Sequence, residues 1–433
     1  MAEAITLLLF TCVLIGCILA DASILIALFL GLLLFLGYGL FRHHTLSSLL
    51  QMAFDGVKGA GNILLTFLVI GMLTAVWRLS GTIPAIIYYS IALIRPSIFL
   101  PLVFVLNAVV SILIGTSFGT AATMGVICMA MGKAMGMSPV LVGGAMLSGA
   151  FYGDRCSPVS TSAMLVSELT KTDLYRNIKA MYRTAVVPTI LTLLLYFLLG
   201  MNHGEAQTDT SIRSLFSSRF HISVVVLLPA VLILILGFLH VKVRKAMLLS
   251  ILVAVCCALF LQHAQVPEIL RACVFGFQPE DAELARLLQG GGILSMVRTM
   301  LIVGISSSYA GIFRGTGLLD GMREKVSAVS KSATPFGATL LVSVFTSMIA
   351  CNQTLATMLT HQLCHTLVPD EETFALYLEN SVITVSALIP WSIACAVPLT
   401  TVEAPLTAAA AAFYLYLLPV WYFLALRAGD KAA

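Results

Sequence analysis

Long apolar runs follow one another along almost the whole chain, and they restrict it to folds that a lipid bilayer can hold. Hydrophobic residues make up 59% of the chain and charged residues only 10%, whereas a soluble domain carries roughly 25% charged residues. We therefore expect an all-α polytopic membrane protein with roughly eleven to fourteen spanning or half-spanning segments. Runs of membrane-spanning quality include residues 4–20, 24–41, 186–199, 224–239, 247–261 and 408–426.

Basic residues cluster between apolar runs, at residues 42–58, 171–183 and 240–245. Because Lys and Arg collect in cytoplasmic loops, we expect a multi-pass protein of a bacterial inner (plasma) membrane with both termini in the cytoplasm. Residues 1–20 lack a basic start and are predicted to be a retained first helix. The net charge of +4 is explained by this topology. We expect the lipid bilayer and no nucleic acid among the partners, and a homodimer could form.

Two polar patches interrupt the apolar sequence, at residues 115–120 and 153–161. The first reads Gly-Thr-Ser-Phe-Gly-Thr, and the second reads Gly-Asp-Arg-Cys-Ser-Pro-Val-Ser-Thr. Glycines and a proline beside hydroxyls, at membrane depth, indicate unwound helix whose free carbonyls and amides can hold an ion. A hairpin-like pair of segments, near residues 119–131 and 140–152, should join the two patches.

A weak internal repeat relates the two halves of the chain. An offset of 236 places Arg78 on Arg314, Thr116 on Asn352, and Asp154 on Pro390. The predicted topology gives the halves opposite orientations, which indicates two inverted-topology repeats with broken helices; an aligned parallel repeat stays open. The predicted divisions are N-terminal transmembrane helices (1–58), a first repeat (59–200), a connecting loop, two helices and external segment (201–290), and a second repeat with the C-terminal helix (291–433).

Asp154 is the first candidate for ion binding. A carboxylate at membrane depth is costly unless it has a partner or a ligand, and proton and sodium could compete for it. The alternative is an Asp154–Arg155 pair that caps a helix at the membrane surface. Glu379 lies in an apolar stretch, residues 372–388, read as one helix. It could reach the membrane interior or mark an interface.

Hydroxyl and amide side chains gather at the polar patches of both halves. Their oxygens suit small cations, although each could instead join helices by hydrogen bonds. Trp391 could act as a gate or pack. The candidate substrate- and ion-binding set is Asp154, Thr116, Ser117, Ser157, Ser160, Thr161, Asn352, Gln353, Thr354, Glu379, Asn380, Trp391 and Ser392.

Other motifs are missing or weak. No Walker, Rossmann or hydrolase motif occurs in a plausible context, which argues against an ATP-driven pump and against an enzyme. His361 and His365 stand four apart without a third ligand, and the ten cysteines lack ligand spacing. We expect no metal site and no cofactor, with Na⁺ and H⁺ as the transported species. Arg78 and Arg314 end apolar spans and are expected to extend to an interface.

The motifs together resemble the NhaC-type sodium/proton antiporter family of the ion transporter superfamily. The resemblance rests on residues 115–120 and 148–158 in the first half. In the second half it rests on Asn352-Gln353, Leu378-Glu379-Asn380 and residues 386–391. It covers most of residues 61–400. It implies ion-coupled secondary transport through inverted repeats with broken helices around a central site. Sodium/proton exchange is the family's main activity, and malate/lactate exchange coupled to sodium and protons is a variant.

Three departures from the family pattern bear on the substrate. The pattern usually has aspartate where this chain has Thr161, Leu-Glu-Asp where it has Asn380 as the third residue, and Pro-Trp-Asn where it has Ser392. The primary expectation is a sodium/proton antiporter. The missing acids favour an alternative, an ion-coupled carrier of a small organic acid, amino acid or amine. A minor alternative is a membrane sensor that does not transport.

Overall fold

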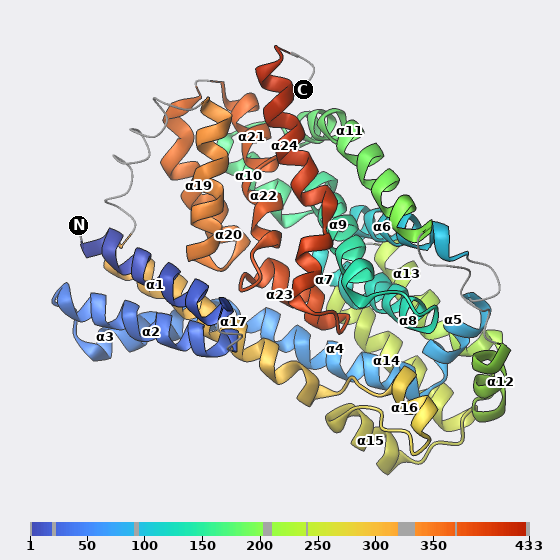
Figure 1. The fold of residues 1–433 in the computed structure, drawn as a ribbon. Helices are drawn as coiled ribbons and strands as arrows, with labels where there is room; N and C mark the ends of the chain where they lie inside the picture. The colour runs from blue at the N-terminus through green and yellow to red at the C-terminus, as the bar shows by residue number, and fades with distance from the viewer. Residues whose placement is uncertain are drawn as a thin grey trace.

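The computed structural model describes residues 2–19, 23–90, 95–201, 210–239, 241–318, 334–368 and 370–429. Within these ranges the structure is helical, and the one β pairing is a single bridge between Phe277 and Gly290 (Figure 1). Six helices are long and apolar enough to cross a membrane, or eight if each of two sharply bent pairs is one span. Three shorter apolar helices accompany them. The predicted all-α polytopic architecture is confirmed.

The N-terminal helices pack around α17, which comes from the second half of the chain (Figure 1). Small residues allow the close contact, since a Cβ on Gly311 would lie 1.9 Å from the Met52 carbonyl oxygen. Phe10, Phe35 and Tyr309 form an aromatic cluster across the same contact. These helices are α1 Ala2–Leu19, α2 Ile24–Phe41, α3 Leu46–Gly59, α4 Gly61–Leu79 and α17 Ile293–Thr316.

The middle of the chain contains the predicted hairpin. Its two arms are residues 117–134 and α9, and the turn between them passes through Gly136 at φ +68°. Gly149 and Gly153 of α9 let it touch the backbone of α6. The elements are α5 Thr82–Ser90, α6 Pro96–Ile114, α7 Ser117–Thr120, the π-helix η1 Ala121–Gly125, α8 Val126–Ala134, α9 Pro139–Cys156, α10 Thr161–Thr170 and α11 Leu174–Met201.

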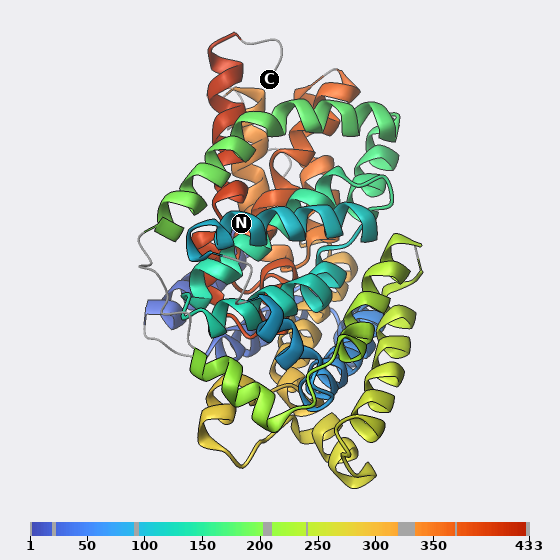
Figure 2. The same cartoon turned by 90° about the vertical axis from the view of Figure 1, so that its right-hand side faces the viewer.

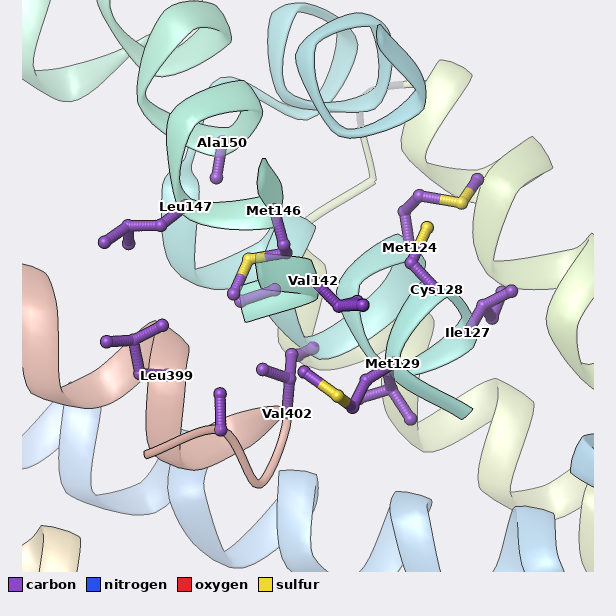
Figure 3. Close-up of a cluster of buried hydrophobic side chains, with 14 of the residues drawn as sticks. Met124, Ile127, Cys128, Met129, Val142, Met146, Leu147, Ala150, Leu399 and Val402 are labelled. Atoms are coloured by element: carbon purple, nitrogen blue, oxygen red, sulfur yellow. The ribbon is translucent and has the colours of Figure 1, made fainter. Parts of the chain in front are cut away.

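A sulfur-rich apolar core holds the hairpin against the end of α23, Ile393–Thr401 (Figure 3). Met124 and Met129 come from η1 and α8, Met146 from α9, and Leu399 and Val402 from α23 and the turn after it. A Cβ on Gly125 would lie 2.9 Å from the Val402 side chain and 3.1 Å from that of Met146, so a larger residue there would have to displace one of them. Methionine fills such irregular gaps well.

The helices of the connecting region lie at the end of the molecule opposite α11 (Figure 2). They are tied to α4 by the Trp77 indole, which donates to the Ser250 hydroxyl at 2.9 Å. The stretch expected to be external, residues 262–290, contains two short helices. The elements are α12 Thr210–Arg219, the 3₁₀ helix η2 Val224–Leu227, α13 Leu228–Phe238, α14 Val243–Phe260, α15 Val266–Phe275 and α16 Ala282–Leu288.

The second half departs from the sequence reading at residues 372–388. One continuous helix was expected there, but α21 ends at Glu379, and Ser381 takes φ −124° and ψ −88°, outside the helical region. The elements are α19 Pro335–Ala350, α20 Gln353–Cys364, η4 His365–Leu367, α21 Glu371–Glu379, α22 Val382–Val385, η5 Ser386–Leu388, α23 Ile393–Thr401, η6 Leu406–Ala411 and α24 Phe413–Arg427, with η4, η5 and η6 being 3₁₀ helices.

Candidate ion-binding site

The first pair of helix breaks matches residue for residue between the halves. Helix α6 ends at Gly115, which is left-handed at φ 72° and ψ 26°, and Thr116 is extended at φ −156° and ψ 130°. Helix α19 ends at Cys351, left-handed at φ 52° and ψ 10°, and Asn352 is extended at φ −145° and ψ 129°. The offset of 236 read from the sequence therefore holds at this break.

Each of these breaks touches the other break of its own half. In the first half, a Cβ on Gly115 would lie 2.7 Å from the carbonyl of Val159, so glycine is required by both contact and φ. In the second half, the carbonyl of Cys351 accepts a hydrogen bond from the amide of Ile393 at 2.9 Å. Unwound backbone is thus gathered at two places inside the protein, as buried irregular backbone in a bilayer requires.

The second pair of breaks corrects the repeat register. Ser160 and Ser392 are both extended N-caps that accept amides of the helix that follows. Pro158 and Pro390 stand two residues before these caps, so this pair aligns at an offset of 232. The prediction that Asp154 corresponds to Pro390 is therefore wrong. The second half has four residues fewer between its two breaks, which is about one helical turn.

Asp154 lies one turn before the α9 break and is buried, at 4% exposure. The Ser160 hydroxyl donates to Asp154 Oδ1 at 2.9 Å, across the break. The Ser162 hydroxyl lies 2.8 Å from that of Ser160 and donates to the Asp154 carbonyl at 3.4 Å. Ser117, at the start of α7, also lies beside the carboxylate. The first-half hydroxyls therefore surround one acid.

Glu379 is fully buried at the end of α21. Both of its carboxylate oxygens lack a hydrogen-bond partner among the described residues. Asp154 and Arg155 are the charged groups close enough to act on it. An ionised carboxylate that is buried without a donor is costly, so this group must carry a proton or a cation.

Arg155 is fully buried and points toward the second half. Its Nε donates to the Glu379 carbonyl at 3.2 Å, and its Nη1 donates to the Met181 carbonyl and the Tyr414 hydroxyl. Its Nη2 donates to the Thr184 hydroxyl and the Asn380 side-chain oxygen. All five N–H groups have neutral acceptors. Within the described part of the chain, no ion pair joins Arg155 to a carboxylate.

A sequence profile of the Na⁺/H⁺ antiporter family matches residues 2–169 and 153–428. The chain belongs to this family. The assignment confirms the family predicted from the motifs and the predicted class, a transporter and not an enzyme. As a member of the Na⁺/H⁺ antiporter family with apolar helices long enough to cross a bilayer, it is a multi-pass membrane protein whose substrates include small ions.

Named relatives of the antiporter family cover most of the chain. The malate-2H⁺/Na⁺-lactate antiporter of Bacillus subtilis is 27% identical over 391 residues, which cover 86% of this chain and 82% of the relative. The Na⁺/H⁺ antiporter NhaC of Alkalihalophilus pseudofirmus is 26% identical over 349 residues, 78% of this chain and 76% of the relative. The arginine/ornithine antiporter ArcD of Halobacterium salinarum is 28% identical over 304 residues, 67% and 62% of the two chains.

In this antiporter the predicted binding residues divide into three groups. The acids lie together with three of the predicted polar residues, and all five are buried: Ser117 and Ser160 lie beside Asp154, and Asn380 follows Glu379 and accepts from Arg155. A second group is half-buried or supports the breaks, and the third group, Thr161 and Thr354, is exposed. The supporting residues are Thr116, Ser157, Asn352, Gln353, Trp391 and Ser392.

The supporting residues form hydrogen bonds with the backbone near the helix breaks. The Ser157 hydroxyl donates to the Ile112 carbonyl at 2.6 Å, and the Trp391 indole donates to the Met348 carbonyl at 2.9 Å. Asn352 and Ser392 accept backbone amides as N-caps, and the Gln353 amide donates to the Ile383 carbonyl at 3.1 Å. These bonds satisfy backbone freed by the broken helices.

Sequence reasoning missed three features of the antiporter. It assigned Arg155 a role only in the alternative reading, as the partner of Asp154 at the membrane surface, but both residues are buried and Arg155 turns to Asn380. It did not find Ser162. It also expected Arg78 to extend to an interface, whereas Arg78 is buried and pairs with Glu403 at 2.7 Å, and Lys133 completes the cluster at 2.9 Å from Glu403. For the buried Arg155, the one available signal in the sequence was its adjacency to Asp154.

The remaining candidates for metal chemistry do not come together as a set of metal ligands within the described ranges. His361 and His365 stack with ring centroids 5.9 Å apart. No group of three or more His, Cys, Asp or Glu side chains is placed to hold a metal ion in the described ranges. All ten cysteines are free thiols. Six of them are buried, as small apolar side chains in membrane helices would be.

Proposed function

We propose that this protein exchanges Na⁺ for H⁺ across a bacterial plasma membrane, with Asp154 and Glu379 as the groups that hold the two cations. The single observation that carries the proposal is the Glu379 carboxylate, which is fully buried without a hydrogen-bond donor among the described residues. Such a group needs a proton or a small cation. Asp154, with the hydroxyls of Ser117 and Ser160 beside it, supplies the hard oxygen ligands that Na⁺ prefers.

The mechanism follows from competition between the two cations. When a proton is bound, one of the two acids is neutral and the site needs no Na⁺. When Na⁺ is bound, the proton leaves. Both acids are closed off from solvent in this conformation, so each exchange requires the breaks to open to one side. The helix breaks at Gly115, Ser160, Cys351 and Ser392 offer the hinges for this movement because these residues already lie outside helical geometry.

The orientation and assembly belong to the proposal. The basic clusters support cytoplasmic termini, and the matched breaks support a division into repeats at residues 59–200 and 291–433 with opposite orientation. The apolar side chains exposed on α2, α11 and α14 suit contact with lipid, and a homodimer is the proposed assembly. Cysteine accessibility at each end of the chain tests the orientation, and light scattering of the purified protein tests the dimer.

Flux in proteoliposomes tests the function. The purified protein should move protons when Na⁺ is added, as an internal pH dye reports, and Li⁺ and K⁺ serve as comparison ions. Two relatives are named for organic substrates, malate with lactate and arginine with ornithine, so these compounds are added in a second series. Proton movement that needs one of them and ignores Na⁺ alone would replace the proposal by the organic-ion alternative. No movement with any of these ions would refute it.

A further inference from the structure

The buried site contains a permanent positive charge next to its two acids. Arg155 follows Asp154 in the chain, and its Nε bonds the carbonyl of Glu379, the other acid. A guanidinium stays protonated at every physiological pH. The positive charge of Arg155 is therefore part of the site in every step of transport.

Arg155 cannot serve as a ligand for an incoming anion. Its five N–H groups already donate to Glu379, Met181, Tyr414, Thr184 and Asn380. The side chain is also fully buried. Its contribution to the site is therefore charge and not a free donor.

The acceptors of Arg155 leave its charge uncancelled. Asn380, a neutral amide, accepts from Nη2 at the place where a carboxylate would form an ion pair. Glu379 is the carboxylate near enough to act on the guanidinium, and Asp154 in turn acts on Glu379. Because a buried charge in low dielectric requires compensation, the acids of the site must supply it, with Glu379 nearest to the guanidinium.

We propose that Arg155 acts as a fixed counter-charge that allows the site one exchangeable monovalent cation at a time, so that exchange is electroneutral, one Na⁺ for one H⁺. With both acids ionised, two negative charges and one positive charge leave the described site at −1. One Na⁺ or one H⁺ brings it to zero, while a second cation would leave a net positive charge at membrane depth. The inference rests on the function proposed above and adds its stoichiometry.

The zero-flux point of the purified protein tests this count. Proteoliposomes are given opposing Na⁺ and H⁺ gradients, and the membrane potential is fixed with K⁺ and valinomycin. Flux should stop when the two concentration ratios are equal, at every imposed potential. A zero-flux point that moves with the potential would overturn the inference while leaving Na⁺/H⁺ exchange in place. The absence of Na⁺-dependent flux would instead refute the proposed function.

A variant tests the part played by the neutral acceptor. Asn380→Asp would add a carboxylate beside Arg155 and change the site from −1 to −2, so the same charge balance requires two monovalent cations, and the Na⁺ dependence of flux should change from hyperbolic to cooperative. Asn177→Asp is the matched control, since Asn177 is also a buried amide, bonded to Thr172, and its Na⁺ dependence should match that of the wild type. A Na⁺ dependence that stays hyperbolic in folded Asn380→Asp would contradict the role of Arg155. If that variant does not fold, the wild-type measurement still decides the stoichiometry.

Discussion

The Ser160 hydroxyl donates to Asp154 Oδ1 at 2.9 Å, and Ser160 Oγ also accepts the amides of the first turn of α10. One side chain thus connects the buried acid to the start of the next helix, across the break. The positive end of the helix dipole at α10 also faces the acid. A cation that binds or leaves Asp154 would change the charge of the carboxylate that the Ser160 cap of α10 contacts. If Asp154 binds the cation as proposed, this contact would connect ion binding to the start of α10.

Asp154→Asn should abolish Na⁺-dependent proton movement and leave the protein folded. The amide keeps the size and accepts the Ser160 hydrogen bond, but it can neither bind a proton nor offer a charge. The free energy of unfolding should change by about 1 kcal/mol or less. Flux in proteoliposomes and elution by size-exclusion chromatography measure the two effects.

The matched control is Asp173→Asn, the same change at an exposed acid that accepts the Arg176 amide at 2.9 Å. It should leave flux unchanged. If Asp154→Asn behaves like this control, Asp154 is a structural cap and the site must be built on Glu379 alone.

Glu379→Gln should also abolish the exchange, for a different reason. Because no described donor contacts its oxygens, the wild-type side chain contributes charge and proton binding but no hydrogen bonds. We therefore expect thermal stability near that of the wild type, within about 1 kcal/mol. Glu372→Gln is the control, since Glu372 is exposed and pairs with Arg176 at 3.1 Å. Retained pH-dependent flux in Glu379→Gln would remove Glu379 from the mechanism.

Gly115→Ala should destabilise the first break by about 1–3 kcal/mol. An alanine there would have to adopt φ +72° and would press its Cβ against the Val159 carbonyl. Gly304→Ala in α17 is the opposite case, because a Cβ there has nothing within 4 Å and the helix gains about 0.5–1 kcal/mol. Thermal unfolding in detergent compares the pair. Equal stability of the two variants would show that the break adapts to a side chain.

Asp370 caps α21, the helix whose last residue is Glu379. Hydrogen bonds from the hydroxyl and amide of Thr373 hold the pKa of Asp370 below its usual value. Asp370→Ala should lower stability by about 1 kcal/mol. Asp370→Asn, which keeps a capping oxygen, should lower it less at neutral pH.

The pH dependence of this cap has a definite sign. A depressed pKa in the folded state stabilises the protein above the unfolded-state value of about 4. That contribution is lost as the pH falls through the folded-state pKa. The advantage of wild type over Asp370→Asn should therefore be present at about pH 6 and disappear toward about pH 3. A constant advantage across this range would mean that the charge of Asp370 does not strengthen the cap.

The breaks were predictable from sequence because unwinding inside a bilayer needs particular residue types. Gly115 and Pro158 are such residues, and both lie at breaks. Asn380 and Ser381 carry a weaker signal in an apolar stretch, and the α21 break was missed there. The direction of a long side chain was not predictable at all. Arg155 crosses to Asn380, 225 residues away in the chain, and only tertiary packing decides between that partner and the neighbouring Asp154.

The role of Glu403 was not predictable either, because its partners lie 325 and 270 residues away in the chain. It follows α23 in a turn, and its carboxylate bonds Arg78 of α4 and Lys133 of α8. Glu403→Gln would leave these two cations facing each other without a counter-charge. Breaking a buried pair costs about 3–5 kcal/mol, but the Glu403 side chain is 28% exposed, so we expect about 2 kcal/mol.

Thermal unfolding measures this loss, and two further variants define its cause. Glu403→Gln combined with Lys133→Gln should recover part of the stability, since one of the opposed cations is then gone. Glu372→Gln removes a pair whose side chains are 75% and 57% exposed, and should cost no more than about 0.5 kcal/mol. If the Lys133 change adds to the loss instead of relieving it, repulsion is not the cause. The cluster would then stabilise the antiporter through packing alone.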